Sequence, residues 1–229
     1  MNAALKNKPD GVGYAFFDVD DTLISVKSML SFQDFWYERF NEHQARELYY
    51  NDLRQHMHES ASWEVLNRLY YQHFAGRRVA DVEQCGEAWF AHMEEKHPDL
   101  FHKIPLAELK HHQDEGREVV FVSGSFPAIL KPVARVTKVR HILSTLMEVE
   151  NECYTGRILT PQTIGAGKAE AIRIFLASVN GVAEHCYAYG DDISDLPMLQ
   201  SVGKPTVVRG GRGLEQRAQE LGWRIISPV

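Results

Sequence analysis

The stretch YAFFDVDDT, residues 14–22, joins a short aromatic run to a cluster of acids. Brief apolar runs of this kind predict a buried strand, and we expect one over Tyr14–Asp20. A parallel strand opens at its carboxyl end onto the edge of the sheet where ligands bind. Asp18, Asp20 and Asp21 therefore mark a candidate site as well as the end of the first strand.

Strand-like and helix-like segments alternate from Pro105 to the end of the chain. We expect strands or extended segments over residues 118–122, 143–150, 153–158, 186–189, 206–208 and 223–226. We expect helices over residues 106–116, 127–137, 168–178 and 214–221, and another after Asp195. This alternation predicts a parallel sheet with helices on both faces.

Residues 28–103 have a different pattern, without a convincing strand. Large apolar side chains recur there at helical spacing, first at Met29, Phe32, Trp36 and Phe40 and again at Trp63, Leu66, Tyr70 and Phe74. The sequence therefore predicts one α/β domain that is interrupted after its first strand by an all-helical insertion.

The composition of the 229 residues is that of a globular protein, because 44% hydrophobic and 24% charged residues exclude a disordered or collagen-like chain. The net charge of −6 argues against a nucleic-acid or anionic-membrane surface. No stretch approaches the roughly 18 apolar residues of a membrane span. Because Met1–Pro9 also lacks the apolar core of a signal peptide, we expect a cytoplasmic protein.

Four short polar motifs fall at strand ends or helix starts. They are Asp18-Val19-Asp20-Asp21-Thr22, Ser123-Gly124, Lys168 and Gly190-Asp191-Asp192-Ile193-Ser194-Asp195. Each has an ordinary explanation by itself, as a solvated turn, a helix cap or a surface lysine. Their order at four successive junctions makes chance a poor explanation, so we interpret them as parts of one site.

The combination suits phosphoryl transfer. A carboxylate can attack phosphorus and form an aspartyl-phosphate, which divides a difficult hydrolysis into two easier steps. Asp18 and Asp20 point to the same side if the strand conformation continues through them. Clustered carboxylates favour a hard cation such as Mg²⁺. Ser123, Gly124 and Lys168 offer a hydroxyl, an amide and a positive charge to the phosphoryl oxygens.

These motifs resemble those of the haloacid dehalogenase (HAD) superfamily of phosphohydrolases: DxDxT at Asp18–Thr22, a strand ending in Ser123-Gly124, then Lys168 and GDxxxD at Gly190–Asp195. The helical insertion and the run Gly190–Leu199 are similar to the phosphoserine-phosphatase-like subfamily IB, which has a helical C1 cap. The resemblance implies a Rossmann-like α/β core with a mostly parallel sheet over residues 11–25 and 104–229. It implies a cap over residues 26–103.

The resemblance also implies roles for the matching residues. Asp18 is expected to be the nucleophile and an Mg²⁺ ligand. Asp20 is expected to be the general acid and base, and its backbone carbonyl is expected to reach the metal. Ser123 and the Gly124 amide are expected to hold the phosphoryl group, while Lys168 neutralises it and orients the nucleophile.

The remaining implied residues surround the metal. Asp191 is expected to bind Mg²⁺, with Thr22, Asp192 and Asp195 in supporting positions. One position departs from the phosphoserine phosphatase pattern, because Lys27 stands where a cap glutamate would bind the substrate ammonium. A cation there argues against phosphoserine and makes Lys27 a candidate for selecting a substrate with a further anionic group. Lys27 is equally explained as a solvated residue at a helix start.

The leading hypothesis is a phosphomonoesterase for a small phosphorylated metabolite, with no nucleic-acid or membrane partner and with a homodimer left open. The alternatives are a phosphotransferase or mutase that uses the same phosphoenzyme, and a catalytically silent HAD-fold binding protein. A Walker A interpretation of residues 165–168 fails because Ala169 stands where Ser or Thr is required. The pairs His56/His58 and His111/His112 are predicted to lie on exposed helix faces rather than to bind zinc.

Overall fold

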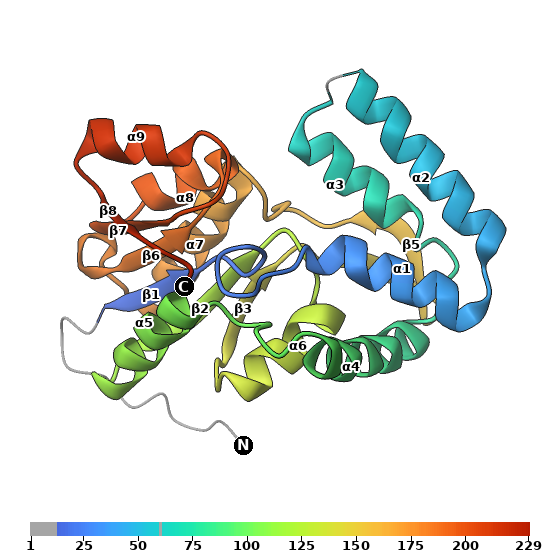
Figure 1. Cartoon of the computed structure of the whole chain (residues 1–229), viewed down its shortest axis with the longest axis horizontal. Coiled ribbons are helices and arrows are strands. Elements are labelled where there is room, and N and C mark those ends of the chain that lie inside the picture. Colours follow the sequence, from blue (N-terminus) through green and yellow to red (C-terminus); the bar gives the residue numbers. More distant parts are fainter. Residues whose placement is uncertain (1–12, 60) are drawn as a thin grey trace.

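The computed structural model describes residues 13–59 and 61–229. The expectation for Met1–Pro9 and the start of the core at residue 11 fall outside the described residues. In Figure 1 the sheet and its covering helices form one side of the molecule, and the helices of residues 28–96 form the other.

A six-stranded sheet organises the larger side. Its strands are β1 (Tyr14–Phe17), β2 (Glu118–Ser123), β3 (His141–Ser144), β6 (Tyr187–Gly190), β7 (Lys204–Val208) and β8 (Arg224–Ile226). Their order is β3-β2-β1-β6-β7-β8, and every neighbouring pair is parallel. The direction of winding changes at β1, so the carboxyl ends of β1, β2 and β6 form the switch point where such sheets bind ligands.

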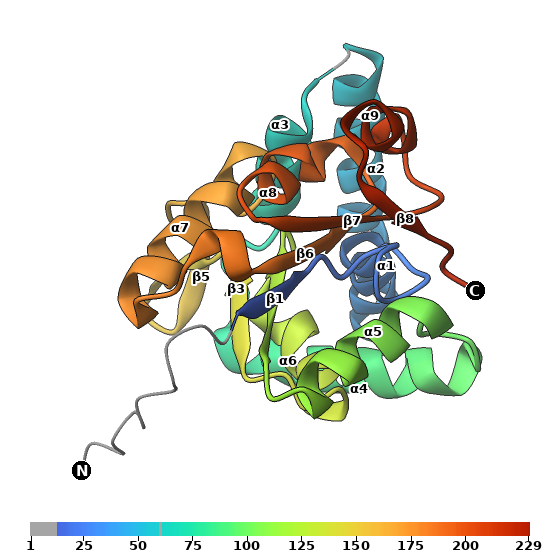
Figure 2. The same ribbon diagram turned by 90° about the vertical axis from the view of Figure 1, so that its left-hand side faces the viewer.

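Helices cover both faces of this sheet, as Figure 2 shows. The covering helices are α5 (Lys103–Asp114) and α6 (Pro127–Val136) on one face, and α7 (Ala166–Val179), α8 (Leu196–Gln200) and α9 (Leu214–Leu221) on the other. Successive residues of β1 point to opposite faces. Phe17 packs in one core with Leu109, and Phe16 packs in the other core with Ile172. The predicted α/β class is confirmed.

The predicted all-helical insertion is present. It consists of α1 (Ser28–Phe40), α2 (His43–His58), α3 (Trp63–Gln72) and α4 (Val79–Lys96), which we call the helical block. Aromatic rings fill its interior, and the Phe32 ring centroid lies 6.2 Å from that of Phe74 and 5.5 Å from that of Phe126. Because Phe126 directly precedes α6, this ring cluster joins the helical block to the sheet side of the molecule.

A separate hairpin changes one prediction. The extended segment expected over residues 143–150 is divided: its first part is the end of β3, and its second part is β4 (Met147–Glu150), which pairs antiparallel with β5 (Cys153–Ile158). The hairpin leaves the main sheet and lies against the helical block (Figure 1). The backbone N–H of Gly76 donates to the carbonyl of Tyr154 at 2.8 Å, and the N–H of Tyr154 donates to the carbonyl of Arg77 at 2.9 Å.

Three further details differ from the expectations. β1 ends at Phe17, so the acids that follow lie in a loop rather than in the strand. α5 begins at Lys103, ahead of Pro105, because proline is tolerated in the first turn, where its missing N–H would have no partner. The predicted exposure of His112 was wrong: this residue is 2% exposed. In the described part of the chain, no helix is both long and apolar enough to cross a bilayer.

Candidate active site

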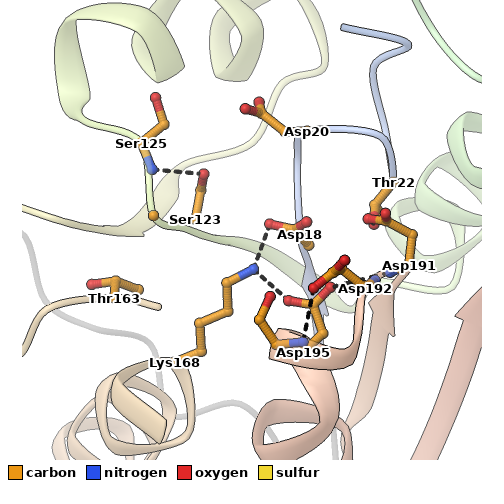
Figure 3. A network of polar contacts seen from close by, with 12 residues as sticks. Asp18, Asp20, Thr22, Ser123, Ser125, Thr163, Lys168, Asp191, Asp192 and Asp195 are labelled. Atoms are coloured by element: carbon orange, nitrogen blue, oxygen red, sulfur yellow. Dashed lines mark hydrogen bonds and ion pairs between the residues drawn. The ribbon is translucent and has the colours of Figure 1, made fainter. Parts of the chain in front are cut away.

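Residues from the four sequence motifs meet at the carboxyl edge of the sheet (Figure 3). Asp18 follows β1, Ser123 ends β2, and Asp191 follows β6. Lys168 lies in the first turn of α7 and reaches into the same space. Parallel strands bring their carboxyl ends to one edge, which explains why residues so distant in sequence become neighbours.

Lys168 connects two buried carboxylates. Its Nζ atom lies 2.6 Å from Oδ1 of Asp18 and 2.6 Å from Oδ1 of Asp195. Burial by itself would lower the pKa of Lys168, but the two carboxylates raise it, so the ammonium stays charged. Burial, together with repulsion from Asp195 and Asp191, raises the pKa of Asp18, and Lys168 opposes that shift.

Two glycines allow this close arrangement. A Cβ atom at Gly190 would lie 2.7 Å from Cβ of Asp195, and one at Gly167 would lie 1.7 Å from the carbonyl oxygen of Gln162. Any larger residue at position 190 would therefore displace Asp195. The second oxygen of Asp195 accepts the backbone N–H groups of Asp191 at 3.1 Å and Asp192 at 3.2 Å. This turn explains the spacing of Gly190, Asp191 and Asp195 in the sequence.

Asp18, Asp191 and Asp195 form an acidic cluster that suits a divalent cation. One carboxylate oxygen from each lies within 4.8 Å of the others. Thr22 Oγ1 donates to Asp191 Oδ1 at 2.7 Å, and burial followed by repulsion from Asp195 raises the pKa of Asp191 to about 7. The raised pKa values of Asp18 and Asp191 reflect the cost of ionising three carboxylates beside the single ammonium of Lys168. A hard, oxygen-binding dication such as Mg²⁺ would balance the two excess negative charges of the fully ionised cluster.

Asp20 points away from the acidic cluster (Figure 3). Its Oδ2 atom accepts the backbone N–H of Ser28 at 2.9 Å and the Ser28 hydroxyl at 3.0 Å, at the start of α1. Its Oδ1 atom is buried and has no hydrogen-bond partner among the described residues. Burial raises the pKa of Asp20 to about 6. A carboxyl group with one oxygen held and one free can give and take a proton near neutral pH.

The loop of residues 123–125 lies opposite these acids and is held by the helical block. The Ser125 N–H donates to Ser123 Oγ at 3.1 Å. Two side chains of α3 donate to the carbonyl oxygen of Gly124: Asn67 Nδ2 at 3.0 Å and Tyr71 Oη at 2.7 Å. Sequence reasoning missed Asn67 and Tyr71, as well as Ser28 beside Asp20. Asn67 and Tyr71 lie four positions apart on one side of α3, but this helix carries other polar side chains as well, so their spacing gave no distinctive signal.

The other predicted residues lie at the rim. The exposed Lys27 precedes α1 and forms an ion pair with Asp21, with Nζ 2.5 Å from Oδ2. Asp192 accepts the Ser194 N–H at 3.0 Å and lies 3.3 Å from the guanidinium of Arg212. Asp192 therefore shapes the turn before α8 and does not belong to the acidic cluster.

A cavity of about 260 Å³ separates the sheet edge from the helical block. Its floor contains the polar residues Asp18, Asp20, Ser123, Gly124, Lys168, Asp191 and Asp195. Its roof comes from α1, α2 and α3 and contains Leu30, Leu53, Met57, Trp63, Leu66 and Tyr70. The roof side chains are therefore mainly apolar, whereas the floor is charged.

Fold and site together define a class of α/β enzymes that bind a ligand at the carboxyl edge of a parallel sheet, beneath an inserted block. Within that class, the chain belongs to the haloacid dehalogenase-like hydrolase family, whose model matches residues 15–200. It is 34% identical over 223 residues to a probable phosphatase of Mycobacterium tuberculosis, an alignment that covers 93% of this chain and 74% of that protein.

Solved structures share the fold. A protein of unknown function from Bordetella pertussis Tohama I has a TM-score of 0.81 at 23% identity, covering 95% of this chain and all 100% of that one. A substrate-bound phosphoserine phosphatase has a TM-score of 0.65 at 14% identity, covering 93% of this chain and 92% of that one. These likenesses confirm the expected Rossmann-like core with its parallel sheet and helical insertion.

Proposed function

We propose that this HAD-family phosphatase is an Mg²⁺-dependent phosphomonoester hydrolase that works through an aspartyl-phosphate on Asp18. The observation that most supports the proposal is the pairing of Asp18 with Lys168. One carboxylate oxygen of Asp18 is bonded to the ammonium, which orients the side chain and leaves the other oxygen for attack. The similarity to a probable phosphatase supports the same reaction class.

In the first step, Asp18 attacks phosphorus and the bond from phosphorus to the leaving oxygen breaks. Asp20 donates its proton to that oxygen, so the alcohol leaves neutral. In the second step, Asp20 takes a proton from water, the water oxygen bonds to phosphorus, and the Asp18 carboxylate is released with inorganic phosphate. The free Oδ1 atom of Asp20 and its raised pKa of about 6 suit both proton transfers.

The phosphoryl oxygens need donors in both steps. We assign the Ser123 hydroxyl, the Gly124 amide and Lys168 to this role, because all three residues line the floor. Asn67 and Tyr71 support the assignment indirectly: by binding the Gly124 carbonyl, they hold the loop in one orientation.

Mg²⁺ would be held by Asp18 and Asp191, together with the backbone carbonyl of Asp20. When bound, it would screen the repulsion between the carboxylates and the phosphoryl group. Asp195 and Thr22 position these ligands through their bonds to Lys168 and Asp191. The buried excess of negative charge in the acidic cluster is the reason for the assignment.

We further propose that residues 26–103 act as a cap that encloses a small phosphorylated metabolite. The experiment is to measure release of inorganic phosphate from a set of phosphorylated metabolites with purified protein, in Mg²⁺ and in excess chelator. We expect release only with Mg²⁺. Release that continues at the same rate in chelator would contradict the metal requirement, and no release from any compound would favour the silent-binding alternative.

A further inference from the structure

We propose that the substrate is a small phosphate monoester with an apolar alcohol part, and that the roof of the cavity binds this part; the proposal holds if the chain is the phosphatase proposed above. The floor has the groups a phosphoryl group needs, but the roof offers side chains of a different chemistry. Leu30, Leu53, Met57 and Leu66 are aliphatic or thioether side chains, and Trp63 and Tyr70 add aromatic faces.

The roof residues near the cavity mouth are unusually exposed for their type. Leu30 is 40%, Met57 58% and Trp63 38% exposed, and they come from α1, α2 and α3 respectively. Three helices therefore contribute large, partly exposed apolar side chains to the same cavity that Asp18 and Asp20 line. Contact with an apolar ligand would remove this surface from water and would favour binding in proportion to the area covered.

The roof of the cavity offers few hydrogen-bond or ion-pair partners to a polar alcohol. Among the described lining residues, the helical block contributes no carboxylate that could pair with an ammonium group. Its amide, Asn67, is already bonded to Gly124 and to Gln162. Lys27 is paired with Asp21, so its charge is balanced before any substrate arrives. The Tyr70 hydroxyl is the one buried side-chain polar atom of the roof without a hydrogen-bond partner among the described residues. A zwitterionic or polyhydroxylated alcohol would therefore lose more hydration here than this single hydroxyl can replace.

The size of the cavity limits the alcohol. Its volume of about 260 Å³ is slightly below the roughly 300–1,000 Å³ typical of small-molecule sites. That volume suits one short chain or one ring attached to the phosphate. A longer chain would extend past Met57 into solvent and would gain little further contact.

The test is a homologous series of unbranched alkyl phosphates, from ethyl to octyl phosphate, measured as kcat/KM in Mg²⁺. Acetyl phosphate serves as a small activated substrate, and phosphoserine as a zwitterionic one. We expect kcat/KM to rise about fourfold per methylene until the roof is filled, and phosphoserine to be roughly a hundredfold poorer than hexyl phosphate. A flat or falling series, or a preference for phosphoserine, would overturn the inference.

A matched pair of variants on α2 locates the effect. Met57→Gln keeps the length of the side chain but makes it polar, so we expect the rise along the alkyl series to become shallower. Leu48→Gln makes a similar change at an exposed position outside the cavity and should leave the series unchanged. An equal response to both variants would also overturn the inference. Hydrolysis of acetyl phosphate with a flat alkyl series would overturn the roof assignment alone, whereas no hydrolysis of either would overturn the phosphatase proposal itself.

Discussion

The floor and the roof of the cavity are built on opposite principles. On the floor, Lys168 holds two carboxylates at 2.6 Å each, and the turn after β6 satisfies Asp195 with backbone N–H groups. On the roof, the side chains of Leu30, Met57 and Trp63 are exposed and converge on the opening without a polar network.

This difference separates reactivity from selectivity. Charged groups at fixed distances can stabilise only a defined arrangement of atoms, so the floor should be sensitive to single-atom changes. An apolar surface accepts ligands of different shapes and favours those whose apolar area it covers most completely. Substitutions on the floor should therefore affect all substrates alike, and substitutions on the roof should change the ranking of substrates.

The largest expected effect is on the floor, at Asp18. Asp18→Asn keeps the shape of the side chain but removes the nucleophile, so we expect kcat to fall by roughly 10⁴-fold or more for every phosphate ester. Asp114→Asn changes an exposed acid at the end of α5 and should retain the wild-type rate. Thermal unfolding of both variants would check that the fold persists. Substantial turnover by Asp18→Asn would exclude Asp18 as the nucleophile.

The next effect distinguishes Asp20 from Asp18. Asp20→Asn should lower kcat by roughly 10²- to 10⁴-fold for an alkyl phosphate, whose leaving oxygen needs a proton. Phosphoenzyme formation from p-nitrophenyl phosphate should suffer less, because that leaving group departs as a stable anion. Rapid-quench experiments can compare the rates of phosphoenzyme formation from the alkyl phosphate and from p-nitrophenyl phosphate. An equal loss with both esters would contradict the general-acid role.

The same variant has a signature in the pH profile. The pKa of Asp20 is raised to about 6, so its acid form is lost as the pH rises through that value. For the wild-type protein, the rate of phosphoenzyme formation from alkyl phosphates should therefore decline above about pH 6. In Asp20→Asn this decline should be absent.

A third effect concerns the stability of the sheet beneath the floor. His112 Nε2 lies 2.9 Å from the hydroxyl of Tyr189, the β6 residue before Gly190, and its Nδ1 lies 3.1 Å from Arg117. Burial, followed by repulsion from Arg117, lowers the pKa of His112 from 6.5 to about 4. The unfolded chain therefore binds an extra proton between these values, and folding stability should fall by up to about 3 kcal/mol as the pH drops from 6.5 to 4.

Matched variants isolate this contribution. His112→Gln removes the titrating group, so the loss of unfolding free energy between pH 6.5 and 4, measured by urea denaturation, should become smaller. His111→Gln alters the exposed neighbour and should leave the pH dependence unchanged. If both variants retain the wild-type dependence, the acid sensitivity has another source.

The smallest expected effect is at Tyr71, which has a connection to both the floor and the roof. Tyr71 belongs to the helical block but bonds to the Gly124 carbonyl on the floor. Tyr71→Phe should lower kcat/KM about three- to tenfold by an equal factor along the alkyl series, because one hydrogen bond is lost. Tyr50→Phe removes a hydroxyl bonded to Asp34, outside the cavity, and should have no such effect. A loss that depends on chain length would place Tyr71 with the roof.

The convergence of the motifs could be expected from the sequence for a physical reason. Parallel strands end at one edge, so the acids after β1, Ser123 at the end of β2 and the Gly190 turn after β6 had to meet there. The helical block was also predictable, because its apolar residues recur at helical spacing. Local patterns were sufficient in both cases.

Contacts between distant segments could not be predicted in this way. Ser28 bonds to Asp20, and Asn67 and Tyr71 bond to Gly124, without any motif that identifies them. His112 on α5 is buried and contacts Tyr189 on β6, a residue 77 positions further along the chain. The division of residues 143–150 into two strands depends on which partners are available to each part, and a single run of apolar residues does not reveal those partners.

The most direct test of the central claim is to find where the phosphoryl group resides during turnover. Wild-type protein would be mixed with substrate and Mg²⁺, quenched in acid within the first turnover, digested and mapped by mass spectrometry. We expect an acid-stable, hydroxylamine-labile phosphoryl group on Asp18, and none in Asp18→Asn or in chelator. A phosphoryl group on another residue, or rapid turnover by Asp18→Asn, would contradict this expectation.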